Sequence, residues 1–162
     1  MDNKVKRETM KEYEKQFLGQ IILKYNLRNA FEFGTSVGNT TEYLSNMCAK
    51  IYTIDIKPDS GIECKNKNIT RLIGDSATYD FSGLYGKFDM VIIDGSHKPK
   101  YVKRDSRNAL KMLRGNGFIF WHDFDLVHPG LVRVVRRFCR SHGFGLKSEL
   151  GTKLVFIRRK GK

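Results

Sequence analysis

Residues 31–44, FEFGTSVGNTTEYL, give the first clear sign of the chain's architecture. A short apolar run over 30–33 ends at Gly34, and Gly38 precedes an amphipathic stretch over 39–49 that opens with Asn39. The run predicts a buried strand, and the stretch predicts a helix joined to it by a glycine-rich loop. Strand, tight loop and helix in this order are typical of the first unit of a parallel α/β sheet.

The same alternation continues along the chain. Further strands are predicted at 51–56, 69–73, 88–94 and 117–121, and further helices at 3–25, 99–114 and 129–142. Two final strands, 144–148 and 153–158, have only a turn at Gly151 between them, so they can pair only as antiparallel neighbours. The predicted fold class is therefore α/β and Rossmann-like, with a mostly parallel seven-stranded sheet, an antiparallel C-terminal strand and helices on both faces.

Length and composition exclude several classes of protein. The 162 residues are enough for one domain with a core, so we expect a single domain over 1–162, with a leading helix in 1–28 and the core in 29–162. No apolar run approaches the ~20 residues of a membrane span, and the charged N-terminus does not resemble a signal peptide. Cys48, Cys64 and Cys139 lie far apart without a C-x-x-C motif, which favours a reducing, cytoplasmic location.

The positive charge is concentrated in the C-terminal part of the chain. Residues 1–97 carry 13 Lys/Arg and 13 Asp/Glu, whereas residues 98–162 carry 17 Lys/Arg and 4 Asp/Glu, which accounts for the net charge of +13. Two predicted helices have basic stripes in which residues three or four apart recur: Lys100, Lys103, Arg104, Arg107, Lys111 and Arg114, then Arg133, Arg136, Arg137 and Arg140. Such stripes could bind an anionic partner or nucleic acid, and the alternative is an ordinary solvated surface.

Acidic residues occur at the carboxyl ends of five predicted strands, where open α/β sheets bind ligands. They are Glu32, Asp55, Asp75, Asp94 and Asp123. His97 follows the fourth strand, and His122 precedes the acid of the fifth. Each residue alone could be a helix cap or a turn residue, but their shared position at one edge of the sheet predicts a binding site.

The first loop suits a small anionic group. Glycines at 34 and 38 would let backbone N–H groups approach a carboxylate, beside an amine held by Glu32. The loop lacks the G-x-G-x-x-G pattern of dinucleotide sites, which disfavours a nicotinamide cofactor. Asp55 lies 21 residues after Gly34, a spacing typical of an acid that binds ribose hydroxyls, and Asp75 with the next residue could contact an adenine edge.

These motifs resemble those of class I S-adenosylmethionine-dependent methyltransferases. The segments FEFGTSVGNTTEYL, YTIDI, IGDS and FDMVIIDG occur in the family's order. The segments IIDGSH and WHDFD, with HPGLVRVVRRF after them, resemble more narrowly the branch that includes macrocin- and mycinamicin-type sugar O-methyltransferases and the cephalosporin-hydroxylase-like proteins. The resemblance covers about residues 30–140.

The resemblance implies roles for individual residues. The implied cofactor-binding set is Glu32, Gly34, Thr35, Ser36, Gly38, Asp55, Ile56, Asp75, Ser76 and Asp94. His97 corresponds to the general base of the sugar-modifying members, and Asp94 and Asp123 correspond to positions that bind magnesium in metal-dependent members. Such members often have an acid before Asp123, but here His122 stands there, so the metal ion is absent or differs in identity.

The residue types agree with methyl transfer to oxygen. The sulfonium is already a reactive methyl donor, so the protein must mainly position the acceptor and remove its proton. Histidine suits that proton transfer, and a divalent ion such as Mg²⁺ would lower the pKa of the hydroxyl further. We therefore expect His97 and Asp94 to be catalytic, Asp94, Asp123 and His122 to be candidate metal ligands, and a small hydroxylated acceptor such as a sugar.

Other functions remain open at this point. The basic C-terminal part favours a nucleic-acid-modifying or nucleic-acid-binding protein. A non-catalytic S-adenosylmethionine binder, or an enzyme that cleaves the cofactor without an acceptor, would use the same binding residues. The chain is also short for a methyltransferase that covers its acceptor, so a second copy in a homo-oligomer could complete the site.

Overall fold

The computed structural model describes residues 9–161. The elements, in chain order, are α1 (Glu12–Tyr25), β1 (Asn29–Phe33), α2 (Asn39–Ser45), β2 (Lys50–Asp55), β3 (Ile69–Ile73), the 3-10 turn η1 (Ser82–Leu84), β4 (Phe88–Ile93), α3 (Pro99–Met112), β5 (Leu113–Trp121), α4 (Pro129–Ser141), β6 (Lys147–Ser148) and β7 (Val155–Arg159).

The strands form one seven-stranded sheet in the order β3-β2-β1-β4-β5-β7-β6. Strands β1 to β5 pair in parallel, whereas β7 pairs antiparallel with both β5 and β6. The predicted fold class is confirmed, including the antiparallel pairing of the last two strands. Because β1 lies beside β4, the chain reverses its direction of winding between these two strands, and ligands bind at such a switch point.

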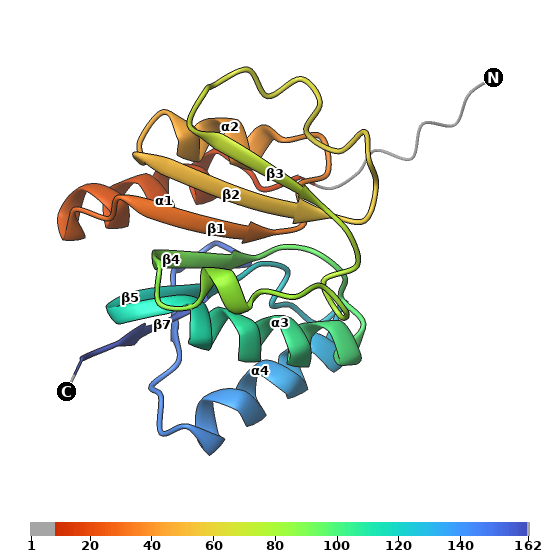
Figure 1. The fold of residues 1–162 in the computed structure, drawn as a ribbon. Helices are drawn as coiled ribbons and strands as arrows, with labels where there is room; N and C mark the ends of the chain where they lie inside the picture. The colour runs from red at the N-terminus through yellow and green to blue at the C-terminus, as the bar shows by residue number, and fades with distance from the viewer. Residues whose placement is uncertain (1–8, 162) are drawn as a thin grey trace.

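Helices cover both faces of the sheet, with α1 and α2 on one face and α3 and α4 on the other (Figure 1). Side chains alternate between these faces along each strand. In β4, for example, Met90 and Ile92 pack in the core beneath α1 and α2, whereas Val91 and Ile93 pack in the core beneath α3 and α4. A central strand that is apolar on both faces explains the continuous apolar run MVII at residues 90–93.

The boundaries of several elements differ from the sequence-based expectation. Helix α1 starts at Glu12 rather than residue 3, and residues 3–8 lie outside the described part of the chain. Helix α2 ends at Ser45 rather than 49, and β6 is reduced to two residues. Strand β5 begins at Leu113 rather than 117, because Leu113 already pairs with Phe88 of β4. Amphipathic periodicity continues past a helix end, so it does not show where backbone pairing with the sheet takes over.

Candidate active site

A cavity of about 600 Å³ lies at the carboxyl ends of the parallel strands. It is lined by residues that follow β1, β2, β3, β4 and β5, which confirms that the five predicted strand ends meet at one place. The lining includes all the predicted cofactor-binding residues except Gly38, and it includes His97 and Asp123. His122 does not line the cavity and lies behind Asp94 and Asp123.

Gly34 lets the first loop pass close to the loop after β4. Its φ is +94°, and a Cβ atom there would lie 2.4 Å from the backbone oxygen of Asp94. Only glycine fits such an approach in this conformation. Gly38 also has a positive φ of +90°, but a Cβ atom there would meet the Sγ of Cys64 instead of the cavity. Gly34 therefore shapes the cavity directly, whereas Gly38 allows the loop to pack closely against Cys64.

Glu32 is buried at the base of the cavity. Its Oε2 accepts a short hydrogen bond from Thr41 and a second one from Thr53 at 2.9 Å. Burial raises the pKa of Glu32 to about 8, although these two hydroxyl groups act in the opposite direction. A buried carboxylate that is stabilised mainly by two hydroxyl groups favours a cationic ligand group, such as an ammonium, beside it.

Asp55 and Asp75 are both held in place by local hydrogen bonds. Asp55 accepts hydrogen bonds from the backbone N–H groups of Ser36 at 2.9 Å and Lys57 at 3.1 Å. Asp75 accepts one from the backbone of Ala77 at 2.9 Å and one from the hydroxyl of Tyr101 at 3.2 Å. Asp75 thus has the turn-capping contact that was its alternative explanation, and it also lines the cavity.

His97 is oriented by Asp123 in front of the cavity. The Nε2 of His97 lies 2.9 Å from Asp123 Oδ2, and the ring of His97 packs against that of His128 with centroids 4.0 Å apart. The hydrogen bond to Asp123 raises the pKa of His97 above its usual value, against the effect of partial burial. A histidine whose one ring nitrogen is held by a carboxylate presents the other nitrogen to a substrate, as in catalytic dyads.

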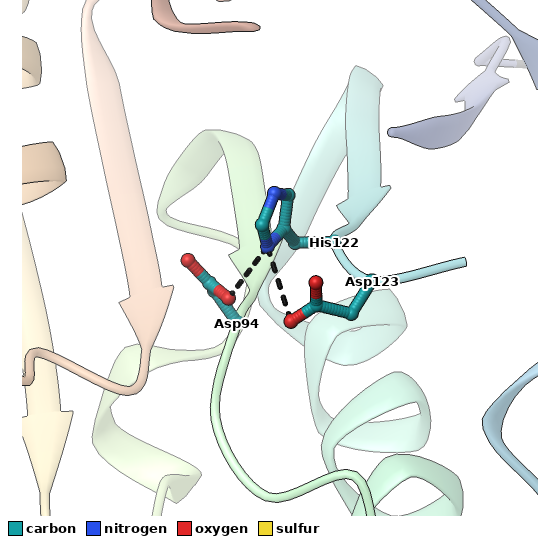
Figure 2. Close-up of side chains that lie close together, drawn as sticks. All are labelled: Asp94, His122 and Asp123. Carbon is teal, nitrogen blue, oxygen red and sulfur yellow. Dashed lines mark hydrogen bonds and ion pairs between the residues drawn. The ribbon is translucent and has the colours of Figure 1, made fainter. Parts of the chain in front are cut away.

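Asp94, His122 and Asp123 form a cluster in which His122 and Asp123 are buried and Asp94 is half-buried (Figure 2). His122 Nδ1 lies 3.1 Å from Asp94 Oδ1 and 3.3 Å from Asp123 Oδ2. Burial lowers the pKa of His122, but hydrogen bonds to Asp123, Asp94 and Glu14 outweigh it and raise the pKa to about 12. The cluster is therefore a region of strongly negative potential that favours a positive charge at its centre.

The donor atoms of this cluster fit a divalent cation. One ligand atom each from Asp94, His122 and Asp123 lies within 4.8 Å of the other two. The second oxygen of Asp123, Oδ1, is buried and accepts no hydrogen bond within residues 9–161, although Lys153 Nζ lies 3.7 Å away. One imidazole nitrogen with two carboxylates suits Mn²⁺, Fe²⁺, Co²⁺ or Zn²⁺ better than Mg²⁺, which prefers oxygen ligands.

The structure adds residues that the sequence analysis did not identify. Glu14 of α1 contacts His122, and Asp105 of α3 lines the cavity although its side chain is almost completely buried. A signal was available in both cases, because each acid lies on the apolar stripe of its helix, four residues before Leu18 and three after Val102. His128, which the sequence analysis did not single out, also lines the cavity.

The basic stripes lie on neighbouring helices. Helices α3 and α4 pack against each other, and α4 carries its four arginines along a second cavity of about 550 Å³. Within residues 9–161, none of these four arginines has an ion pair. Arg114, expected on the stripe of the preceding helix, lies in β5 instead and pairs with Asp89 at 3.4 Å.

Comparison with known families identifies the class of the protein. A family model described as a methyltransferase domain matches residues 31–124, more than half of the chain. The chain belongs to this methyltransferase family. The matched segment contains the first loop, Asp55, Asp75, Asp94 and the cluster up to Asp123. A comparison with curated protein sequences finds no match.

Solved structures of similar fold agree with the family. Cofactor-bound Rv0187 from MTB superposes with a TM-score of 0.81 at 14% identity, covering 98% of this chain and 85% of that one. The O-methyltransferase TomG from Streptomyces achromogenes, in complex with SAM, gives 0.72 at 19% identity, covering 95% and 82%. The methyltransferase MycE of the mycinamycin biosynthetic pathway, with Mg and SAH, gives 0.68 at 19% identity, covering 91% and 49%.

These findings confirm the resemblance to class I S-adenosylmethionine-dependent methyltransferases and the expectation that the chain is an enzyme of that class. None of the helices within the described residues combines the length and apolar character that a membrane crossing requires. The cytoplasmic location expected from the cysteines stays a prediction.

Proposed function

We propose that this methyltransferase transfers the methyl group of S-adenosylmethionine to a hydroxyl oxygen of a small acceptor, such as a sugar. The observation that supports this most is the single cavity that joins the Glu32 end of β1 to His97 and Asp123. It offers an acidic residue for a cationic donor and an oriented histidine for an acceptor hydroxyl. The family match and the O-methyltransferase neighbours support the reaction type.

The cofactor would extend across the carboxyl ends of the first three strands. In this proposal Glu32 binds its ammonium group, and the Ser36 hydroxyl and the backbone N–H groups of Thr35 and Val37 bind its carboxylate. Asp55 then binds the ribose hydroxyls, next to the exposed side chain of Ile56. The third strand end, residues 75–76, contacts the adenine edge.

The chemical step is an in-line displacement at the methyl carbon. The bond between that carbon and the cofactor sulfur breaks as the bond to the acceptor oxygen forms, and the hydroxyl proton moves to His97. Asp123 holds the ring of His97 in position and stabilises its protonated form. The chain's task is therefore to orient two reactants and to accept one proton.

A divalent metal ion is an additional part of this proposal. Asp94, Asp123 and His122 would hold it behind the acceptor. When bound, such an ion supplies positive charge that lowers the pKa of an acceptor hydroxyl. Without the ion, the same carboxylates orient the acceptor and His97.

The experiment that tests the proposal separates binding from transfer. Calorimetric titration with S-adenosylhomocysteine measures binding, and methyl-labelled S-adenosylmethionine with a panel of free sugars, glycosides and phenols measures transfer by mass spectrometry. We expect binding, and an O-methylated product with at least one acceptor. Release of label without any acceptor would favour cofactor cleavage, and absence of binding would exclude the proposal.

The basic stripes on α3 and α4 favour a second candidate function, which is the binding of an anionic partner such as a nucleic acid. Four arginines of α4 line the second cavity, together with the fully exposed Leu126 and with Val132. The described residues that line this cavity include no aromatic side chain, which disfavours stacking on single-stranded bases, so contacts to phosphates are the proposed mode.

Salt-titrated binding tests this second function. RNA and DNA duplexes and single strands are titrated at several salt concentrations against the wild type and the variant Arg133→Ala/Arg136→Ala. A slope of log affinity against log salt that falls by about two in the variant supports phosphate contacts. Absence of binding near physiological ionic strength would exclude the function, and S-adenosylhomocysteine affinity should be equal in both proteins.

The organisation of the molecule is also part of the proposal. We infer that residues 1–162 act as one domain, in which the leading segment helps to cover the site, because Thr9 and Met10 line the cavity. Completion of the acceptor site by a second copy of the chain stays a prediction, which light scattering with and without cofactor checks.

A further inference from the structure

Glu14 connects the leading helix to the buried cluster. Its side chain is 1% exposed, although it lies in the first turn of α1, and both of its oxygens are occupied. Oε2 lies 3.0 Å from His122 Nε2 and accepts a hydrogen bond from the backbone N–H of Lys11 at 2.9 Å. Oε1 accepts one from the backbone N–H of Lys153 at 2.8 Å. Glu14 therefore has a single defined orientation.

The backbone contacts of Glu14 define its part in the contact with His122. Each of its two oxygens already accepts a hydrogen bond from a backbone N–H group, so the side chain acts as an acceptor on both sides. The partner of such an acceptor must supply the proton, so the Nε2 of His122 donates. The proton on Nε2 is thus fixed from outside the cavity, by a helix that precedes the family-matched segment.

The other ring nitrogen then faces two carboxylates. His122 Nδ1 lies between Asp94 Oδ1 and Asp123 Oδ2, as Figure 2 shows. Lone pairs on all three atoms would repel at 3.1 to 3.3 Å, so a positive charge must lie among them. A proton on Nδ1 or a divalent cation satisfies this requirement, and a carboxylate behind a metal-binding histidine is the usual arrangement in metal sites.

We propose that Glu14 is a positioning residue, which directs the Nδ1 lone pair of His122 at a divalent transition metal ion held together with Asp94 and Asp123. This inference deepens the metal part of the proposed function and rests on it. It assigns a ligand class, namely ions that accept imidazole nitrogen, such as Mn²⁺, Fe²⁺, Co²⁺ or Zn²⁺, rather than Mg²⁺. It also gives α1 a role in the site beyond packing against the sheet.

A spectroscopic experiment on the full chain tests this inference without an activity measurement. Co²⁺ is titrated while its visible absorption is followed, and pulsed electron paramagnetic resonance of the Mn²⁺-loaded protein detects coupling to imidazole nitrogen. The variants are Glu14→Gln, His122→Asn and, as the matched control, Glu12→Gln, which changes an exposed acid in the same helix turn. Melting temperature and S-adenosylhomocysteine affinity are measured on every sample.

We expect one Co²⁺ per wild-type chain and nitrogen coupling that is lost in His122→Asn. Glu14→Gln should weaken Co²⁺ binding by 10- to 100-fold, the usual effect of removing the partner of a metal-binding histidine, and Glu12→Gln should not. No Co²⁺ binding, binding without nitrogen coupling, or unchanged affinity in Glu14→Gln would overturn the inference. If the wild type does not bind S-adenosylhomocysteine at all, the proposed function is overturned instead, so the two failures are distinguishable.

Discussion

The Nε2 of His97 lies 2.9 Å from the Oδ2 of Asp123, although the two residues follow different strands of the sheet. This contact leaves Nδ1 of His97 as the nitrogen that can accept a proton. We therefore expect His97→Ala to reduce methyl transfer by about 10²- to 10⁴-fold, the usual contribution of a general base, while S-adenosylhomocysteine affinity changes little.

Single-turnover assays with saturating cofactor and calorimetric titration check this expectation. His142→Ala is the control, because His142 is exposed and its contacts, which include Phe138 and Phe144, lie at the C-terminal end of α4 and directly after it. Full turnover in His97→Ala would show that another group removes the proton.

Most of the fold could be predicted from the sequence, because the alternation of apolar runs and amphipathic stretches reflects the layers directly. The five acids at the strand ends were also predictable, since parallel strands deliver their carboxyl ends to one edge. Glu14 and Asp105 were not identified, because their roles depend on which face of each helix meets the site. The helix ends were misplaced where an apolar residue such as Leu113 continues the helical pattern but pairs with the sheet.

The side chain of Asp55 both lines the cavity and holds the backbone of the first loop at Ser36. Asp55→Ala should weaken S-adenosylhomocysteine binding by at least about tenfold, because a charge-assisted contact to the ribose is lost and the loop loses an anchor. Calorimetry measures the affinity, and Asp59→Asn, at an exposed position in the following turn, is the control. Equal affinity in Asp55→Ala and wild type would remove Asp55 from the site.

Burial raises the pKa of Glu32 to about 8, so the free protein holds a proton on this carboxyl group at neutral pH. An ammonium group bound beside Glu32 requires the ionised form and must expel that proton. Affinity for S-adenosylhomocysteine should therefore rise with pH between about 5 and 8, by up to about tenfold per pH unit. Titrations in buffers of different ionisation enthalpy should show proton release, and Glu32→Gln should bind weakly with a flat pH dependence. A wild-type affinity that is constant over this range would contradict the proposed contact.

Asp105 is buried beside the cavity, and burial raises its pKa from 3.8 to about 7. Its folded-state pKa exceeds its unfolded value, so the folded state binds this proton more tightly. The contribution of Asp105 to the free energy of unfolding should therefore be complete below about pH 4 and should be lost as the pH rises toward 7. The loss is roughly 1.4 kcal/mol per unit of difference between the folded-state and unfolded-state pKa values.

The variant Asp105→Asn should remove this part of the pH dependence. Urea unfolding between pH 5 and pH 8 should give a flatter profile for Asp105→Asn than for wild type, while the surface variant Asp59→Asn keeps the wild-type slope. An identical slope in Asp105→Asn and wild type would mean that Asp105 is already ionised at pH 5 in the folded protein, so that burial does not raise its pKa.

Gly34 controls how closely the first loop approaches the loop after β4. In Gly34→Ala the new Cβ atom would lie 2.4 Å from the oxygen of Asp94 and 2.6 Å from the Cα of Gly95, in a backbone conformation with φ of +94°. Backbone atoms on both sides cannot move independently of the sheet, so the substitution should cost about 2 kcal/mol or more in the free energy of unfolding. It should also weaken cofactor binding, because the displaced loop carries Thr35 and Ser36.

Gly83→Ala provides the control, since a Cβ atom there meets nothing within 4 Å, and its unfolding free energy should change by less than about 0.5 kcal/mol. If the two variants unfold at the same urea concentration and bind S-adenosylhomocysteine equally, close contact between these loops is not what shapes the cavity.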